Sequence, residues 1–149
     1  MLDVEHHFSL AAANAFVPRL TEVFREVRED VEVLRTLARE LAEEGFPLGD
    51  EGPVEVDPDA PEAIRRRQSE AHVVAGRIGA ALDGVAEMGL EVKGLDGLVD
   101  FRSRHRGETV YLCWRYGEDA IEHWHTLDGG FAGRRAIGPG DRFEGDAPQ

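Results

Sequence analysis

The chain has 149 residues, of which 42% are hydrophobic and 32% charged, and its formal net charge is −13 at pH 7. A chain of this length suits one domain. Its acidity disfavours binding to nucleic acids and anionic membranes, which are negatively charged. No apolar run approaches the roughly 20 residues that span a bilayer. The N-terminus lacks the basic segment of a signal peptide, and a single cysteine cannot form an internal disulfide. We therefore expect a cytoplasmic protein.

A long helix is predicted from about residue 9 to residue 44. Its hydrophobic positions alternate in steps of three and four, which is the pattern of packed helices. Because Pro18 lacks a backbone amide proton, we expect a kink near Asn14–Val17. The hydrophobic positions are Leu10, Ala13, Val17, Leu20, Phe24, Val27, Val31, Leu34, Ala38 and Leu41.

A second helix is predicted over about residues 60–88, with the same spacing. Its inward positions are Ile64, Arg67, Ala71, Val74, Ile78, Ala81, Val85 and Met88. Residues 45–59 between the helices are rich in glycine, proline and acids and have no period, so we expect an acidic, mobile linker. Two helices with matching apolar stripes and a flexible connection predict a long antiparallel hairpin.

The apolar stripe of the first helix is wider than one helix partner requires. Phe16, Val23 and Leu37 form a second row beside the main stripe. This width predicts a homodimer in which two hairpins bury Phe16, Val23 and Phe24 between them. A different protein could instead occupy the same helices, and the chain would then act as an assembly or adaptor protein.

The period changes to two after residue 97. The segments LVDFRS, TVYLCWRY and IEHWHT alternate and are rich in β-branched and aromatic residues. They predict a small three-stranded antiparallel meander over about residues 98–126. The expected fold is therefore α+β, with a helical hairpin and a meander in one domain over residues 1–137. Residues 138–149 are expected to form a disordered tail.

The strand register decides which side chains share a face. If Tyr116 pairs with Ala120, and Arg102 with Thr109, one face is apolar: Val99, Phe101, Val110, Leu112, Trp114 and Trp124. The other face then gathers Asp100, Tyr111, Cys113, Arg115, His123 and His125. A longer turn, with Tyr116 opposite Ile121, would move both histidines to the apolar face. We prefer the first register because it separates apolar from polar side chains more cleanly, but the sequence does not decide between the two.

The polar face in the first register has the composition of a metal site. A His-x-His pair on a strand places two imidazoles about 6.5–7 Å apart on one side. His123 and His125 are candidate ligands of a transition metal such as zinc, iron or copper, and Cys113 on the next strand and Asp100 beyond it could complete the set. The structural alternative is that Cys113 is a buried small hydrophobe and His125 a packing residue.

A small-ligand site on the same region is a further possibility. Consecutive glycines in LDGGFAGR let backbone amides converge beside Arg134. The candidate ligand-binding residues are Asp100, Tyr111, Arg115, Trp124 and Arg134. No catalytic motif is evident, and a mid-strand cysteine is poorly exposed for nucleophilic chemistry, so a non-enzymatic function is favoured.

Four segments of the chain resemble a known bacterial family. HFSLAAANAFVP, GLVDF, VYLCWRYGE and WHTLDGGFAGR are similar to those of domain-of-unknown-function family 2203, over most of residues 7–137. Arg135 stands where that family leads us to expect glutamine. The resemblance implies a fold of helices with a small sheet and implies nothing about activity. The matching residues are Phe8, Asn14, Pro18, Gly97, Asp100, Phe101, Cys113, Trp114, Gly117, Glu118, Trp124, His125, Gly130, Phe131, Gly133 and Arg134.

Overall fold

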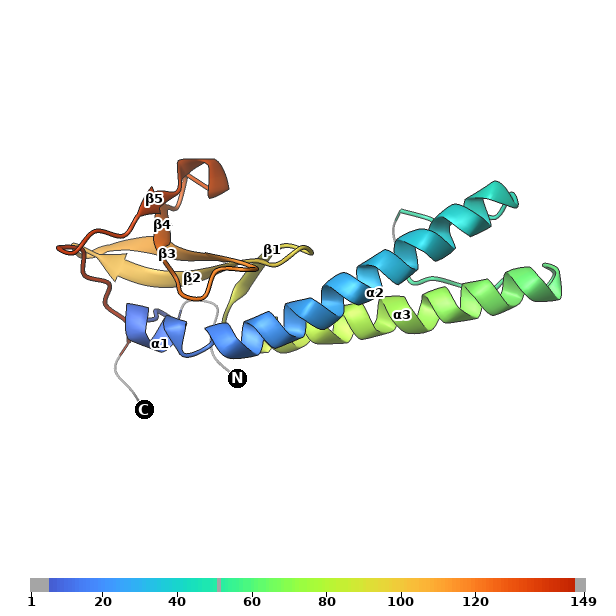
Figure 1. Cartoon of the computed structure of the whole chain (residues 1–149), viewed down its shortest axis with the longest axis horizontal. Coiled ribbons are helices and arrows are strands. Elements are labelled where there is room, and N and C mark those ends of the chain that lie inside the picture. Colours follow the sequence, from blue (N-terminus) through green and yellow to red (C-terminus); the bar gives the residue numbers. More distant parts are fainter. Residues whose placement is uncertain (1–5, 51, 147–149) are drawn as a thin grey trace. The chain divides into compact units, whose positions relative to one another are not determined.

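The structure, a computed structural model, describes residues 6–50 and 52–146 and has the predicted α+β fold (Figure 1). It divides into two compact units within the predicted single domain. One contains Arg25–Leu82, and the other contains the described residues before and after that range. Among the described residues, no helix is long and apolar enough to cross a membrane.

The first predicted helix is broken where proline was expected to break it. α1 spans Leu10–Asn14, with the Ser9 hydroxyl accepting the Ala12 amide proton at 3.1 Å, and α2 spans Val17–Glu43. Pro18 lies in the first turn of α2, where a missing amide proton is tolerated. The break frees the Asn14 side chain, whose Oδ1 accepts a hydrogen bond from the Ile121 amide at 2.7 Å.

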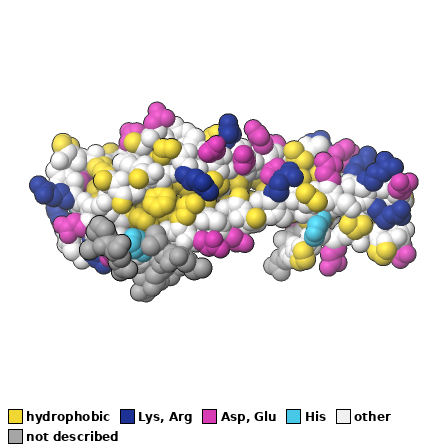
Figure 2. All heavy atoms as spheres, turned by 90° about the horizontal axis from the view of Figure 1, so that it is seen from below, with side chains coloured by type: hydrophobic (Ala, Val, Ile, Leu, Met, Phe, Trp, Pro, Cys, Tyr) yellow, Lys and Arg dark blue, Asp and Glu magenta, His cyan; other side chains and the backbone are white. Residues whose placement is uncertain are grey.

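Residues 25–82 contain most of α2 and of α3, which spans Glu62–Glu87. The helices run antiparallel, and two hydrogen bonds of 2.9 and 3.2 Å join Arg77 to Asp30. Acidic and basic side chains intersperse on the surface of this hairpin (Figure 2). The apolar side chains of the connecting segment pack inward: Phe46 and Leu48 lie against Leu41, Ala60 and Ile64. Its mobility remains a prediction.

The sheet has five antiparallel strands in the order β1-β2-β3-β4-β5, so the prediction of three strands was incomplete. The additional strands flank the meander and are short. Their two to four residues cannot display a clear alternation, which explains why periodicity missed them. The strands are β1 (Glu91–Gly94), β2 (Leu98–His105), β3 (Glu108–Arg115), β4 (His123–Thr126) and β5 (Arg135–Ala136).

The register between β2 and β3 differs from the prediction by two residues. Arg102 pairs with Tyr111, not with Thr109, and His105 pairs with Glu108. Arg106 and Gly107 form the whole turn, and both have positive φ, 54° and 80°, as a two-residue type I′ hairpin requires. A shift of two leaves every side chain on its predicted face. It changes the neighbours, however, and places Asp100 opposite Cys113.

The register between β3 and β4 follows the first of the two alternatives. Leu112 pairs with Trp124 and Cys113 with His123. His125 pairs with Tyr111 and therefore lies diagonally across from Cys113. The shorter turn is confirmed.

The apolar face of the sheet packs on the N-terminal helical segments. Phe24 contacts Trp114, with ring centroids 6.1 Å apart, and Phe8 and Phe16 contact Phe101 at 5.6 and 6.1 Å. Phe24, Phe101 and Trp114 have no exposed surface. The second apolar row on the first helix is thus partly covered by the chain's own sheet. A helix from a second chain is not needed to explain Phe16 and Phe24.

Residues 138–146, for which we expected disorder, lie along the edge of β2. Arg104 and Glu144 exchange backbone hydrogen bonds of 2.8 and 3.0 Å, and Phe143 is buried beside Trp124. The Asp146 amide donates to the His7 carbonyl at 2.8 Å. This segment could not be predicted from periodicity, because it is held by a single β-bridge at Glu144 and a single buried aromatic residue, Phe143.

The contact between Phe24 and Trp114 gives a stability prediction. Replacing Phe24 by alanine should lower the free energy of unfolding by about 3–5 kcal/mol, as for other buried aromatic residues. Val73→Ala, at an exposed position on α3, should change it by less than about 0.5 kcal/mol. Urea unfolding followed by tryptophan fluorescence measures both. Equal effects of the two substitutions would contradict the described core.

Candidate metal site

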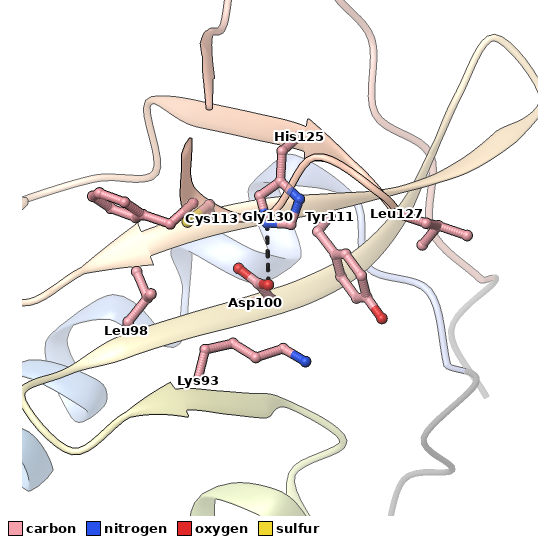
Figure 3. Close-up of a pocket in the computed structure, with 9 residues that line it drawn as sticks. Lys93, Leu98, Asp100, Tyr111, Cys113, His125, Leu127 and Gly130 are labelled. Atoms are coloured by element: carbon pink, nitrogen blue, oxygen red, sulfur yellow. Dashed lines mark hydrogen bonds and ion pairs between the residues drawn. The ribbon is translucent and has the colours of Figure 1, made fainter. Parts of the chain in front are cut away.

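Three potential metal ligands meet on the other face of the sheet. Asp100 of β2, Cys113 of β3 and His125 of β4 each offer one ligand atom, and these atoms all lie within 4.8 Å of one another (Figure 3). All three residues are buried. Each comes from a different strand, so the sheet register alone brings them together.

The hydrogen bonds of His125 leave one nitrogen directed at the carboxylate. Its Nδ1 lies 2.7 Å from the Thr126 carbonyl oxygen, which can only accept, so Nδ1 carries a proton. Its Nε2 lies 3.1 Å from Asp100 Oδ2. In a neutral imidazole with a protonated Nδ1, Nε2 is an acceptor. A lone pair thus faces a carboxylate oxygen, and a second proton or a cation must lie between them.

The remaining oxygen of Asp100 increases the need for a cation. Oδ1 is buried and receives no N–H or O–H hydrogen bond from any described residue, and the only other donor beside this carboxylate is the weak S–H group of Cys113. A buried carboxylate without a full set of partners is strongly destabilising, because water no longer solvates its charge. Asp100 therefore presents an unsatisfied donor atom inside the group.

The Cys113 thiol is protonated in the absence of a cation. Burial, and then the negative charge of Asp100, raise its pKa to about 12, although Arg134 acts in the opposite direction. A reactive cysteine has a lowered pKa, so this thiol is not a nucleophile by itself. A bound metal ion reverses the situation, because a coordinating thiol loses its proton.

The spacing of the three ligand atoms is close to that of a tetrahedral metal site. Bonds of about 2.0–2.3 Å from zinc to O, N and S place ligand atoms roughly 3.3–3.8 Å apart. The present upper limit of 4.8 Å exceeds this spacing by about 1 Å. The Nδ1 contact of His125 with a carbonyl oxygen is also the usual second hydrogen bond of a metal-binding histidine.

The other predicted ligand, His123, does not belong to this group. Its backbone is opposite Cys113, but its Nδ1 lies 3.5 Å from Glu118 Oε2, toward the turn. The sequence suggested His-x-His because both imidazoles share a face. The register instead puts Asp100 next to Cys113 and supplies the third ligand atom from β2.

The predicted ligand-binding residues are divided between the two faces. Asp100 and Tyr111 line the cavity beside the group. Trp124 lies on the apolar face, in contact with the rings of His105 and Phe143. Arg134 donates to Glu118 and to the Cys113 carbonyl and so braces the turn.

A cavity of about 220 Å³ adjoins the three residues. Five of its lining residues were not predicted as site residues, four of them because β1 and the loop after β4 have no periodic pattern, while the fifth, Leu98, begins β2. The GG pair was the one available signal: Gly130 has a φ of 56°, which favours glycine and turns the chain over the cavity. The residues missed are Lys93, Leu98, Leu127, Gly130 and Phe131.

The family of this chain follows from its match to a family model. The model of a family described as uncharacterised conserved protein (DUF2203) matches residues 6–137. The chain belongs to this family. No curated protein and no solved structure matches the chain. The family description assigns no activity, so the chemistry of the site has to be argued from its residues.

The raised pKa of Cys113 predicts an alkaline loss of stability in the metal-free protein. An unfolded cysteine ionises near pH 8.5, whereas the folded thiol has a pKa of about 12. The stabilisation is complete below the unfolded pKa and is lost as pH rises through the folded one. Between about pH 8 and pH 10, wild-type protein in chelator should lose about 2 kcal/mol more than Cys113→Ala. Urea unfolding at both pH values measures the difference. Equal losses would contradict the described burial.

Proposed function

We propose that this protein binds a divalent transition metal ion through Asp100, Cys113 and His125, with zinc as the first candidate. The observation that supports this best is the facing pair of acceptors, His125 Nε2 and Asp100 Oδ2, with the Cys113 thiol beside them. One cation can be shared by all three groups, while a proton between the first two does not engage the Cys113 sulfur.

A purely structural role for the three residues is less consistent with their energetics. A buried imidazolium–carboxylate pair loses the solvation of two charges, and its mutual attraction often fails to offset that cost. Apolar side chains of similar volume would pack this face without the penalty. Polar groups retained at such a position favour a function, and the mixture of O, N and S donors favours a metal.

The donor set favours zinc over harder cations. Calcium and magnesium bind oxygen ligands, whereas thiolate and imidazole suit zinc, copper and iron. Zinc accepts a carboxylate, an imidazole and a thiolate in one tetrahedral set. The thiol must be reduced to bind, which agrees with the cytoplasmic location that we propose.

The ligand count favours a site that is open to small molecules. Structural zinc sites have four protein ligands, and sites that bind water or substrate have three. Asp100, Cys113 and His125 supply three, and they line a cavity. We therefore propose a metal-dependent small-ligand-binding module as the function of this sheet.

The direct experiment measures zinc binding by untagged protein. Wild-type protein, dialysed against zinc and then against buffer, should retain one equivalent by elemental analysis. Asp100→Asn, Cys113→Ser and His125→Ala should each weaken binding by at least about 100-fold, since each removes a ligand and not only its support. Saturating zinc should raise the melting temperature of the wild type.

The matched control is His123→Ala. His123 lies on the same strand and the same face as His125 but outside the group. Its replacement should leave zinc retention at one equivalent. Absence of zinc from the wild type, or an equal loss in the control, would contradict the proposal. Circular dichroism verifies that each variant is folded, so that loss of binding is not loss of structure.

The homodimer is a second proposal, and it concerns the hairpin. Phe24 is covered by the sheet, so the support that remains is the exposure of Val33 and Val73 on α2 and α3. We propose that residues 25–82 form a helical dimer or bind a partner helix. Light scattering at micromolar concentration should give the mass of two chains. A mass of one chain would contradict the dimer.

A further inference from the structure

We propose that the fourth coordination position of the metal takes the carboxylate of a small molecule whose body is apolar. This inference rests on the proposed metal site and specifies the ligand class. Asp100, Cys113 and His125 all line one side of the cavity of about 220 Å³, so a fourth ligand to their metal would approach from that space. The cavity is smaller than the roughly 300–1,000 Å³ of pockets for drug-sized ligands, which favours a compact molecule.

The walls of the cavity determine the character of the ligand body. Leu98, Tyr111, Leu127 and Phe131 supply mainly apolar surface. Leu127 and Phe131 remain 50% and 44% exposed, although both border the cavity. Large apolar side chains exposed beside a pocket are typical of a binding surface, since a ligand would bury them. The ligand therefore needs an apolar body, and an inorganic anion would leave these walls exposed to water.

Phe131 is held at the cavity by two cations. The guanidinium of Arg134 lies 4.9 Å from its ring centroid, and that of Arg115 lies 5.8 Å from it. Arg134 is itself fixed by a 2.8 Å hydrogen bond to Glu118. The ring is thus restrained before a ligand arrives, which lowers the entropic cost of binding.

Charge determines the character of the ligand head. A zinc ion with one carboxylate, one thiolate and one neutral imidazole has no net charge, and an anionic group can then bind at the open position. Lys93 is the only cationic residue that lines the cavity among the described residues (Figure 3). Its Nζ lies 3.2 Å from Glu91 Oε1, and its side chain is 45% exposed, so it is partly compensated and accessible. A carboxylate bound to the metal would gain a second favourable interaction from this ammonium group.

The experiment uses full-length protein loaded with Co²⁺, whose thiolate charge-transfer band reports the site. Benzoate should change the visible spectrum saturably, and acetate should require at least about tenfold higher concentration, because acetate lacks the apolar body. Benzyl alcohol, which has the body without the charge, should produce no change. Three such probes separate the contribution of the head from that of the body.

Two variants test the residues that define this ligand class. Lys93→Met should weaken benzoate binding roughly tenfold, as expected for the loss of one interaction with a charged group. Phe131→Ser should reduce the advantage of benzoate over acetate. The matched controls are Arg106→Met at the hairpin turn and Leu95→Ser, an exposed apolar position outside the cavity. Both controls should bind benzoate like the wild type.

The possible failures are distinguishable. Absence of the thiolate–cobalt band would overturn the metal site, and the ligand proposal would fall with it. A normal cobalt band that benzoate leaves unchanged would overturn the ligand proposal alone. Equal affinities for benzoate and acetate would contradict the proposal that the ligand has an apolar body. An unchanged benzoate affinity in Lys93→Met would contradict the proposed interaction of Lys93 with the carboxylate.

Discussion

The pairing of β2 with β3 is the constraint on which the site depends. The turn at Arg106 and Gly107 sets this pairing, because a two-residue loop with both residues at positive φ permits one register. In that register Asp100 faces Cys113, and the next strand adds His125 on the diagonal. Three side chains from three successive strands thereby meet on one face of the sheet.

One face of the sheet contributes to stability, and the other carries the candidate metal ligands. One face packs Phe101 and Trp114 on the N-terminal helical segments, and this apolar contact stabilises the unit. Because that contact holds the strands, the other face can bury an aspartate and a histidine in an unfavourable electrostatic setting. The folding energy of one side thus supports the polar group on the other, as at many binding sites on rigid scaffolds.

Much of the fold follows from the sequence, since its strongest signals are local. The three-and-four spacing locates both helices, and Pro18 locates the break between α1 and α2. The alternation of two locates β2, β3 and β4 and separates the two faces within each strand, but it left open whether the β4 histidines share a face with Cys113. The strands β1 and β5 and the segment around Phe143 were missed, because they are held by pairing and burial and have too few residues for a period.

The site was predicted in part for a related reason. Periodicity separates the two faces within a strand but does not give the partner across strands, so Cys113 and His125 shared a face with Asp100 and His123 in only one of the two predicted registers. A slide of two residues preserves faces and exchanges neighbours. Which of these side chains meet Cys113 therefore depended on the turn. Lys93 and Phe131 come from segments with no periodic pattern, and only the folded chain brings them to the cavity.

In the proposed site, the protein binds a metal ion through one sulfur ligand together with oxygen and nitrogen ligands. X-ray absorption at the zinc edge of the loaded wild-type protein measures this coordination directly. We expect one sulfur at about 2.3 Å and three oxygen or nitrogen atoms at about 2.0–2.1 Å. In Cys113→Ser the sulfur contribution should disappear. A wild-type spectrum with no sulfur ligand would contradict the account, since the zinc would then be bound elsewhere on the chain.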